Sequence, residues 1–355
     1  MAKVMKAIGL NAGVRPGGIN QLSVFEMPMP ELRPRDLLVR VAAAGMNPVD
    51  VKKGNTNVVR EGTDPLKAPL VLGYDGAGVV ESVGPECSLF KPGDYVYFAG
   101  AIQRNGSNAE FVAIDERIVG HAPKRASLTE AAAMPLVLLT AWEGLAEGLG
   151  LQAHNPKFAG KRILVVPGAG GVGSFVIQLA SQMYGLEVIA TASRPESAKA
   201  CLNLGAKSTI NHREPLKPQL AELGIEEVDY VYNAFDTAVY FKQYADIIKP
   251  LGKMVSIVET SEDLPLTDLM VKRISFAWEF MFTRPMFEVD MEFQGFVLNE
   301  GARMLDSGAL KLPEVKVLPF DLDALKLAHT EQADGKTIGK TVLEVREKTF
   351  AFGGA

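Results

Sequence analysis

One segment limits what this chain can fold into more than any other: an apolar run at residues 162–166 that leads directly into a glycine-rich loop. The loop has the spacing G-x-G-x-x-G, at Gly168, Gly170 and Gly173. Apolar residues then recur on one face of a helix, at Val172, Val176, Leu179 and Met183. The segment therefore predicts a strand, a tight turn and a helix, the arrangement in which a helix N-terminus faces a bound phosphate.

Each glycine of this loop has a separate expected role. Gly168 permits the tight turn, Gly170 lets the backbone approach a diphosphate, and Gly173 allows the helix to pack closely on the strand. Gly171 and Val172 complete the phosphate-binding loop. The alternative is a glycine-rich turn without a ligand. Strand-helix repeats further along the chain favour dinucleotide binding over that alternative.

The rest of the chain divides by pattern. Apolar runs alternate with helical segments at residues 162–166, 187–192, 208–211, 228–232, 253–258 and 274–278, which predicts an α/β domain with a doubly wound parallel sheet. Before residue 127 the chain has short strands at 37–41, 76–83 and 95–98 and a Pro-Gly-Asp turn, typical of a barrel-like β domain. Extended segments return at 315–318 and 341–345. We therefore predict a first domain of residues 1–127, rejoined by 313–350, and a dinucleotide-binding domain of residues 128–312.

The position that selects between the two nicotinamide dinucleotides lacks an acid. An NAD site usually has Asp or Glu about 20 residues after the motif, bonded to the ribose 2′-hydroxyl. Here that position is Ser193, followed by Arg194, with Lys199 nearby. These side chains suit the 2′-phosphate of NADPH. The alternative is that Arg194 and Lys199 are solvated charges at the start of a helix.

The composition of the chain argues against several other classes of protein. The net charge of −5 argues against nucleic-acid binding, which calls for a basic face. Two cysteines, Cys87 and Cys201, are too few for a disulfide framework or a four-cysteine zinc site. The longest apolar stretch, residues 131–142, is too short to span a bilayer. We expect a cytoplasmic enzyme that contacts neither nucleic acid nor membrane.

Four motifs carry a resemblance to a known family: AGMNPVD at 44–50, GYDGAG at 73–78, LTAW at 139–142, and the loop at 167–173. They resemble the zinc-free quinone oxidoreductase branch of the medium-chain dehydrogenase/reductase superfamily. Residues 210–212 and 276–284 resemble a subgroup often labelled zinc-type alcohol dehydrogenase-like. The resemblance implies a Rossmann domain joined to a GroES-like β-barrel catalytic domain.

The same resemblance bears on zinc. In the zinc alcohol dehydrogenases a Cys stands at the position of Asn47, a Gly-His-Glu at residues 73–75, and a third ligand near Leu136. The four-cysteine structural lobe has no counterpart. Asp75 alone could bind a metal here, and one carboxylate does not hold zinc. We expect no bound metal.

The resemblance also implies catalytic residues. Asn47 is expected beside the nicotinamide ring, with Asp50 in a supporting role, although both residue types are also common in turns. Tyr74 would orient the substrate or donate a proton, or it is a packed core tyrosine. Asp75 is alternatively a buried, paired carboxylate.

Further cofactor contacts are expected outside the loop. The resemblance implies a nicotinamide-side contact for Thr140, an adenosine-side contact for His212 and a cofactor contact for Lys340, against the alternatives of helix back-bonding, an exposed loop histidine and a solvated lysine. Asn233 and Phe235 follow the fourth predicted strand of the sheet, and Val258 ends the fifth, where backbone groups would meet the ribose or the carboxamide. The carboxyl ends of parallel strands face a dinucleotide, so these residues are also candidates.

The predicted activity is NADPH-dependent, metal-free hydride transfer to a small-molecule quinone or α,β-unsaturated carbonyl. The proton donor is left open between solvent, Tyr74 and Tyr97. A zinc-type alcohol dehydrogenase and a non-catalytic NADPH-binding regulatory protein are the alternatives. The aromatic alternation from residue 276 to 282 predicts a half-buried strand. The resemblance implies that the last strand of this sheet lies at its edge and pairs with the same strand of a second copy, and an exposed apolar edge invites such pairing. We therefore predict a homodimer through residues 274–278, with part of 278–287 lining the substrate site.

Overall fold

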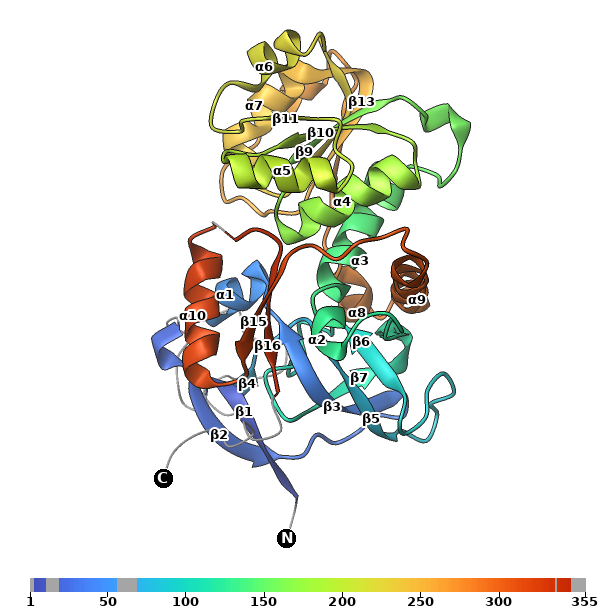
Figure 1. The fold of residues 1–355 in the computed structure, drawn as a ribbon, viewed down its shortest axis with the longest axis vertical. Helices are drawn as coiled ribbons and strands as arrows, with labels where there is room; N and C mark the ends of the chain where they lie inside the picture. Colours follow the sequence, from blue (N-terminus) through green and yellow to red (C-terminus); the bar gives the residue numbers. More distant parts are fainter. Residues whose placement is uncertain (1–2, 11–18, 56–68, 336, 346–355) are drawn as a thin grey trace. The chain divides into compact units, whose positions relative to one another are not determined.

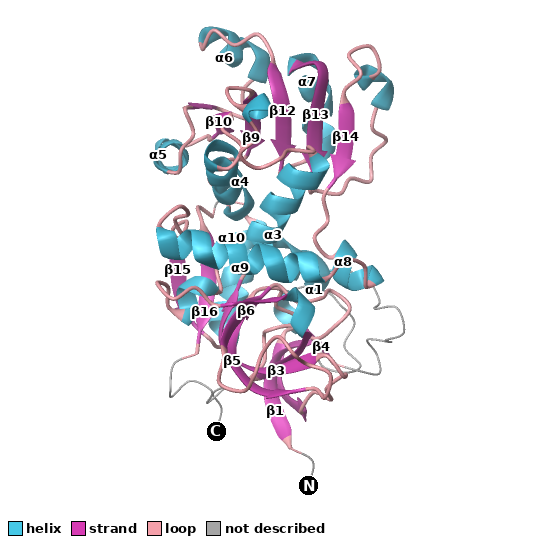
Figure 2. Cartoon of the chain, turned by 90° about the vertical axis from the view of Figure 1, so that its right-hand side faces the viewer, coloured by secondary structure: helices cyan, strands magenta, loops and turns pink. Residues whose placement is uncertain are grey.

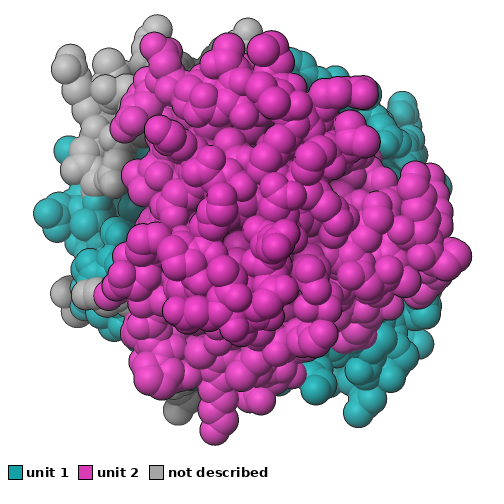
Figure 3. All heavy atoms as spheres, turned by 90° about the horizontal axis from the view of Figure 1, so that it is seen from above, with its two compact units in different colours: residues 1–136, 282–355 teal, residues 137–281 magenta. Residues whose placement is uncertain are grey.

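The computed structural model describes residues 3–10, 19–55, 69–335 and 337–345 (Figure 1). The chain forms two compact units, residues 1–136 with 282–355 and residues 137–281, which Figure 3 colours separately. We call them unit 1 and unit 2. The first boundary falls within α3 (Pro135–Glu143), nine residues beyond the predicted 127/128. The second lies at 281/282, where the sequence predicted 312/313.

Unit 2 is built on one parallel sheet in the strand order β11-β10-β9-β12-β13-β14. Its strands are β9 (Arg162–Val166), β10 (Glu187–Thr191), β11 (Ser208–Ile210), β12 (Val228–Asn233), β13 (Ile248–Ser256) and β14 (Ser275–Trp278). All six residues of β12 are buried, because a sheet covered on both faces needs apolar residues on each. The predicted doubly wound parallel sheet is confirmed.

Helices cover both faces of this sheet (Figures 1 and 2). They are α4 (Gly171–Gln182) and α5 (Pro195–Asn203) on one face, and α6 (Leu216–Glu222) and α7 (Thr237–Ile247) on the other. Short helical turns complete the unit: η3 (Gly144–Gly148), η4 (Pro156–Phe158) and η5 (Leu266–Leu269). The strand order reverses direction between β9 and β12, and ligands of open parallel sheets bind at such a point.

Unit 1 is mainly antiparallel. One sheet has the order β15-β16-β3-β5-β6-β8 with β7 paired to β3, and a smaller one has the order β2-β1-β4. The strands are β1 (Val4–Leu10), β2 (Ser23–Pro28), β3 (Asp36–Gly45), β4 (Leu70–Val71), β5 (Gly76–Val83), β6 (Tyr95–Phe98), β7 (Phe111–Asp115), β8 (Val119–His121), β15 (Val315–Pro319) and β16 (Lys340–Glu344). The predicted Pro-Gly-Asp turn joins β5 to β6, and its Gly93 has φ +92°, which glycine adopts without strain.

The helical parts of unit 1 come from both ends of the chain. They are η1 (Ile19–Gln21), α1 (Pro48–Asn55), η2 (Glu116–Ile118), α2 (Leu128–Ala131), α8 (Thr283–Phe287), α9 (Glu292–Ser307) and α10 (Leu322–Ala333). Gly120 of β8 lacks the Cβ that would lie 2.6 Å from Leu298 of α9, so the helix packs closely on this strand. This packing assigns α9 to unit 1 and moves the domain boundary away from its predicted place. Helical periodicity marks a helix but does not say which core it covers.

Candidate active site

The glycine-rich loop of unit 2 joins β9 to α4, in the predicted strand-turn-helix arrangement. Gly170 precedes the helix with φ −76° and ψ 173°, and no side chain caps the helix N-terminus. The first N–H groups of a helix have no acceptor within it, and together with the helix dipole they attract anions. Gly170, Gly171 and Val172 are partly exposed at this end of the helix.

A hypothetical Cβ distinguishes the three motif glycines. At Gly173 it would lie 2.2 Å from the Pro167 carbonyl oxygen, so only glycine lets the helix approach the strand this closely. At Gly168 it would lie 2.7 Å from the side chains of Ala190 and Cys201, and φ is outside the left-handed region. Gly168 therefore serves packing as well as the turn. A Cβ on Gly170 would meet nothing within 4 Å, and this open space fits a diphosphate.

The other predicted cofactor residues of unit 2 follow the carboxyl ends of neighbouring strands. They are Ser193 and Arg194 after β10, His212 after β11, Asn233 and Phe235 at and after β12, and Val258 after β13. Because the strands are parallel and adjacent, these ends share one edge of the sheet with the glycine-rich loop. Lys199 lies further along, exposed on α5.

The basic side chain at the ribose position is partly exposed. Arg194 is the last residue before α5, and its Nε lies 3.7 Å from a carboxylate oxygen of Glu196. This ion pair is solvent-exposed, and such pairs contribute little energy, so a phosphate can compete for the guanidinium. Ser193 beside it is partly exposed.

Two further predicted cofactor residues, Asn233 and Phe235, differ in how exposed they are to a ligand. Asn233 is fully buried, its Nδ2 donates to Ser256 Oγ at 3.0 Å, and its Oδ1 accepts from Tyr244 at 2.8 Å. That amide holds the turn after β12, and the Asn233 carbonyl oxygen accepts from the Ile257 N–H at 3.1 Å. Phe235 is 43% exposed and lies 6.0 Å from the ring of His212, centroid to centroid. Burial lowers the pKa of His212, which keeps its ring neutral and suited to an aromatic neighbour.

Thr140 lies on α3, in the part of that helix that belongs to unit 2. Its carbonyl oxygen accepts a hydrogen bond of 2.7 Å from the hydroxyl of Tyr232, a buried residue of β12. Gly144 permits this approach, since a Cβ there would lie 2.6 Å from the Tyr232 ring. The helix backbone at Thr140 is thereby tied to the central strand of the sheet.

Unit 1 holds a second group of candidates, a buried cluster of Asn47, Asp50, Asp75 and Lys340. Asn47 follows β3, Asp50 lies in the first turn of α1, Asp75 precedes β5, and Lys340 begins β16. The four exposed fractions are 1%, 0%, 0% and 4%, respectively. β16 pairs with β3 through Val342 and Gly45, which brings Lys340 to the other three across most of the chain (Figure 1).

Lys340 is the centre of this cluster. Its ammonium donates to Met46 O at 2.9 Å, to Asn47 Oδ1 at 2.7 Å and to Asp75 Oδ2 at 2.7 Å. Asp75 Oδ2 also accepts from Asn47 Nδ2 at 2.8 Å, and its Oδ1 accepts from the Leu136 N–H at 2.7 Å. Lys340 is therefore not solvated, so that alternative is wrong, while Asp75 is the buried, paired carboxylate that the sequence allowed.

Asp50 holds the backbone around Asn47. Its two oxygens accept from the N–H groups of Asn47 at 2.8 Å and Gly73 at 3.0 Å. Burial raises the pKa of Asp50 to about 7, against the opposing effects of these N–H groups and of Lys340. Burial also raises the pKa of Asp75, which the Lys340 ammonium opposes. These contacts hold the backbone beside Asn47, and the supporting role of Asp50 stays a prediction.

The two tyrosines considered as proton donors are both buried. Tyr74 is 1% exposed and packs edge-on against Phe282, with ring centroids 5.4 Å apart. Tyr97 donates its hydroxyl hydrogen to the Leu298 carbonyl oxygen, and burial raises its pKa far above the usual value. Tyr97 is therefore a poor proton donor, which leaves solvent and Tyr74 from the original choice.

Comparison with known proteins agrees with both units. Residues 33–140 match the alcohol dehydrogenase GroES-like domain and residues 171–295 match the zinc-binding dehydrogenase family. The chain is 38% identical to the zinc-type alcohol dehydrogenase-like protein SAS2087 of Staphylococcus aureus, over 96% of this chain and all of the relative. The chain belongs to the medium-chain dehydrogenase/reductase superfamily.

Other members of the superfamily extend this result. The 2-methylene-furan-3-one reductase of Solanum lycopersicum is 31% identical over 89% of this chain and 73% of the relative. A Rhizobium etli structure provisionally called a zinc-dependent alcohol dehydrogenase has TM-score 0.88 and 39% identity, covering 98% of this chain and 99% of that one. The Coxiella burnetii quinone oxidoreductase has TM-score 0.79 and 26% identity, covering 97% of this chain and all of that one. These relatives support the superfamily and its zinc-free branch, and the resemblance drawn from the motifs is confirmed.

Some of these names include zinc, but the residues of this medium-chain dehydrogenase/reductase do not fit the ion. Where zinc relatives carry Cys and His, the chain has Asn47 and a packed Tyr74. Both oxygens of Asp75 accept N–H hydrogen bonds, and an ammonium lies 2.7 Å from one of them. A divalent cation there would face the charge of Lys340. Across residues 3–10, 19–55, 69–335 and 337–345, no three His, Cys, Asp or Glu side chains form a group that could hold a metal.

The sequence missed the residues that complete the cluster. Ser107 Oγ donates to the Asp75 carbonyl oxygen at 2.6 Å. Its neighbour Asn108 is fully buried, and among the described residues its side-chain amide has no hydrogen-bond partner. Neither residue lies in a recognisable motif. The sequence held one signal for the burial of Lys340, which is its place just before the apolar residues Val342 and Leu343 of a predicted extended segment.

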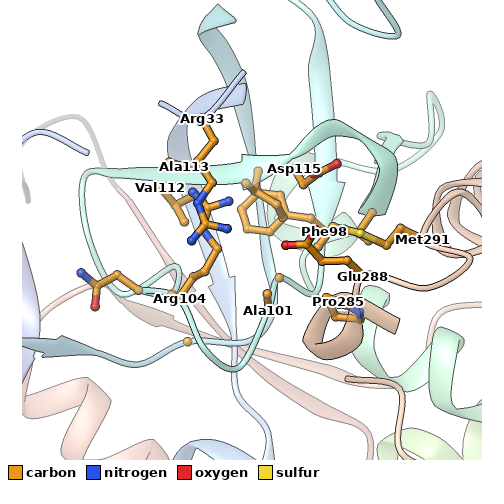
Figure 4. A pocket seen from close by; sticks show the side chains of 16 residues that line it. Arg33, Phe98, Ala101, Arg104, Val112, Ala113, Asp115, Pro285, Glu288 and Met291 are labelled. Atoms are coloured by element: carbon orange, nitrogen blue, oxygen red, sulfur yellow. The ribbon is translucent and has the colours of Figure 1, made fainter. Parts of the chain in front are cut away.

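A pocket that is partly open to solvent lies elsewhere in unit 1 (Figure 4). Phe98, Val112 and Met291 line its apolar part, and Arg33 and Arg104 contribute charge. Arg104 makes a two-point ion pair with buried Asp36, at 2.7 and 2.6 Å. None of the four cluster residues lines this pocket.

None of the helices in the described ranges is long and apolar enough to cross a membrane.

Proposed function

We propose that this protein is an NADPH-dependent reductase of quinones or α,β-unsaturated carbonyl compounds that works without zinc. The observation that carries the proposal is the donor set of unit 1, where a lysine ammonium and two N–H groups occupy the oxygens of Asp75. Without a Lewis acid, an unactivated alcohol or ketone reacts poorly. A quinone or enone is already electron-poor and accepts hydride more readily.

The residues of unit 2 would hold the dinucleotide. The loop from Gly168 to Gly173 would receive the diphosphate at the N-terminus of α4, and Arg194 with Ser193 would receive the 2′-phosphate. Lys199 is an additional basic group on α5. His212 and Phe235 would contact the adenosine part, Thr140 would lie on the nicotinamide side, and Asn233 and Val258 would face the cofactor at the ends of their strands. When bound, NADPH supplies a hydride, two electrons with one proton, to the electron-poor carbon of the acceptor.

The protein must then support charge on the acceptor oxygen and allow a proton to arrive. Hydrogen-bond donors aimed at this oxygen stabilise the developing enolate or hydroquinone anion. Tyr97 already donates to a backbone carbonyl and Tyr74 is buried, so we assign the second hydrogen of the reduced product to water. The balance is one hydride and one proton added per molecule of quinone or enone.

A substrate panel tests the proposal. Purified protein is assayed with NADPH and with NADH against quinones, linear and cyclic enones, simple aldehydes and primary alcohols, alongside metal analysis. We expect turnover of quinones or enones with NADPH and far less than one zinc per chain. One zinc per chain with alcohol oxidation would contradict it. NADPH binding without turnover of any acceptor would favour a regulatory protein.

We also propose that the protein forms a homodimer through β14, the last strand in the order of the unit 2 sheet. Trp278 on this strand is 51% exposed, and an unpaired apolar strand edge favours association with a second copy. The predicted alternation to residue 282 is shorter in the structure, because the strand ends at Trp278 and Phe282 is buried. The part of residues 278–287 predicted to line the substrate site stays a prediction, as does the cytoplasmic location.

A further inference from the structure

The side-chain amide of Asn47 lies between a buried cation and a buried anion. Its oxygen accepts from Lys340 Nζ at 2.7 Å, and its nitrogen donates to Asp75 Oδ2 at 2.8 Å. The cation and anion are themselves 2.7 Å apart. The three groups therefore form a closed triangle of hydrogen bonds within unit 1.

This triangle fixes which way the amide points. If the amide were rotated by half a turn, its NH₂ group would face an ammonium and its oxygen would face a carboxylate. Both contacts would be repulsive, and buried charges are poorly screened. A buried Asn without charged neighbours can rotate its amide by half a turn at a small cost in free energy. For Asn47 the two charged neighbours make that rotation costly.

All three hydrogens of the Lys340 ammonium and one of the two hydrogens of the Asn47 amide are used in hydrogen bonds within unit 1. An ammonium has three hydrogens, and those of Lys340 go to Met46, Asn47 and Asp75. A contact between Lys340 and a ligand would require one of these bonds to break. Asn47 Nδ2 has two hydrogens, and within the described part of the chain only one is used.

We propose that Lys340 and Asp75 are positioning residues that hold the Asn47 amide with its second N–H ready to donate to the carbonyl oxygen being reduced. This inference rests on the proposed reductase function. The ammonium that bonds to Asn47 Oδ1 draws electron density from the amide and strengthens the remaining N–H as a donor. Asn47 is the catalytic residue of this arrangement, and Lys340 acts only through it.

The experiment compares two ion pairs of unit 1, each of which neutralises a buried carboxylate, and only one of them contacts Asn47. Lys340→Met removes the cation that orients Asn47, and Arg104→Met removes the partner of buried Asp36, which has no contact with Asn47. We expect Lys340→Met to lower kcat by about 10- to 100-fold, the scale of losses from misplaced groups. We expect the Kd for NADPH and the KM for the quinone to stay within about threefold, while Arg104→Met keeps kcat within about twofold.

A double mutant separates positioning from stability. Asn47→Ala alone should lower kcat by about 10²-fold or more, the scale of a lost oxyanion donor. If Lys340 acts through Asn47, adding Lys340→Met to Asn47→Ala costs little further activity. An independent additional loss in the double mutant, or an equal loss in Arg104→Met, would overturn the proposal.

A structural readout keeps the test independent of activity. In ¹⁵N-labelled protein the side-chain amide signals of Asn47 should shift strongly in Lys340→Met and stay in place in Arg104→Met.

If Lys340→Met does not fold, Lys340→Arg is used. It keeps the cation but cannot reproduce three contacts from one nitrogen, so the same signals and kcat should change in part. Unchanged signals would refute the positioning role even if the wild type reduces quinones. Absence of quinone and enone turnover in the wild type would instead refute the proposed function.

Discussion

Two alanine substitutions in the glycine-rich loop should affect different properties, one the stability of the fold and the other the affinity for NADPH. Together they test how a dinucleotide binds. Gly173→Ala places a Cβ against backbone, and Gly170→Ala places one in open space. The first variant should lose stability. The second should fold normally and lose affinity for NADPH.

The expected magnitudes follow from the contacts. At Gly173 the new Cβ would lie 2.2 Å from the Pro167 oxygen and 2.7 Å from the Gly168 oxygen, more than 1 Å inside ordinary contact for the first. Backbone on both sides cannot move cheaply, so we expect a loss of about 3 kcal/mol, the upper end of overpacking costs. For a domain of this size that lowers Tm by roughly 6–12 °C.

At Gly170 two small effects oppose each other. Alanine reduces the entropy of the unfolded chain by about 0.4–1 kcal/mol, and the observed φ of −76° suits it. Alanine is also a poorer residue than glycine before a helix, by a similar amount. The free energy of unfolding should therefore change by less than about 0.5 kcal/mol. A methyl group against the diphosphate should cost about 1–3 kcal/mol of binding, or roughly 5- to 150-fold in Kd.

Thermal unfolding of the ligand-free protein and titration with NADPH measure both quantities. The reasoning is refuted for the ligand if Gly170→Ala binds NADPH as tightly as the wild type. It is refuted for the packing if Gly173→Ala melts at the wild-type temperature.

Three further predictions concern other parts of the chain. Arg194→Ala should weaken NADPH binding about tenfold or more and leave NADH within about twofold in a fluorescence titration, whereas equal losses would mean that the guanidinium does not meet the 2′-phosphate. Burial lowers the pKa of His329 from 6.5 to about 4, so its folded form resists protonation and wild-type stability falls as pH decreases through that window. His329→Leu should therefore gain about 2 kcal/mol relative to wild type between pH 7 and pH 5 in urea unfolding, and a constant difference would contradict this assignment. Trp278→Glu should convert a dimer to monomers in light scattering after gel filtration, and an unchanged mass would exclude β14 as the interface.

Local sequence patterns were sufficient for most of the α/β sheet. The apolar run at residues 162–166 became β9 with the same bounds, and the next two strands ended within one residue of their predicted ends. A strand buried on both faces favours a run of apolar residues, as in β9, and such a run is visible in a short window of sequence. The glycine spacing identified the loop for a similar reason, because the close approach at Gly173 forbids any side chain.

The second domain boundary, at residues 281/282, could not be predicted from local sequence patterns. The helix that became α9 has a clear apolar face, but a helix of this kind could cover either core. Its contacts with unit 1, such as the close approach of Leu298 to Gly120 and the hydrogen bond from Tyr97 to the Leu298 carbonyl oxygen, assign it to that unit.

The sequence by itself determined the dinucleotide-binding loop, the strands around it and the family, because each depends on residues close together in the chain. Only the tertiary structure decided what surrounds Asn47. Lys340 lies 293 positions away from Asn47 and 265 from Asp75, and it reaches both because β16 pairs with β3. A lysine near the end of a chain looks like a solvated charge until the fold buries it. The cost of burying that charge then requires a carboxylate and polar partners, which the cluster around Asn47 provides.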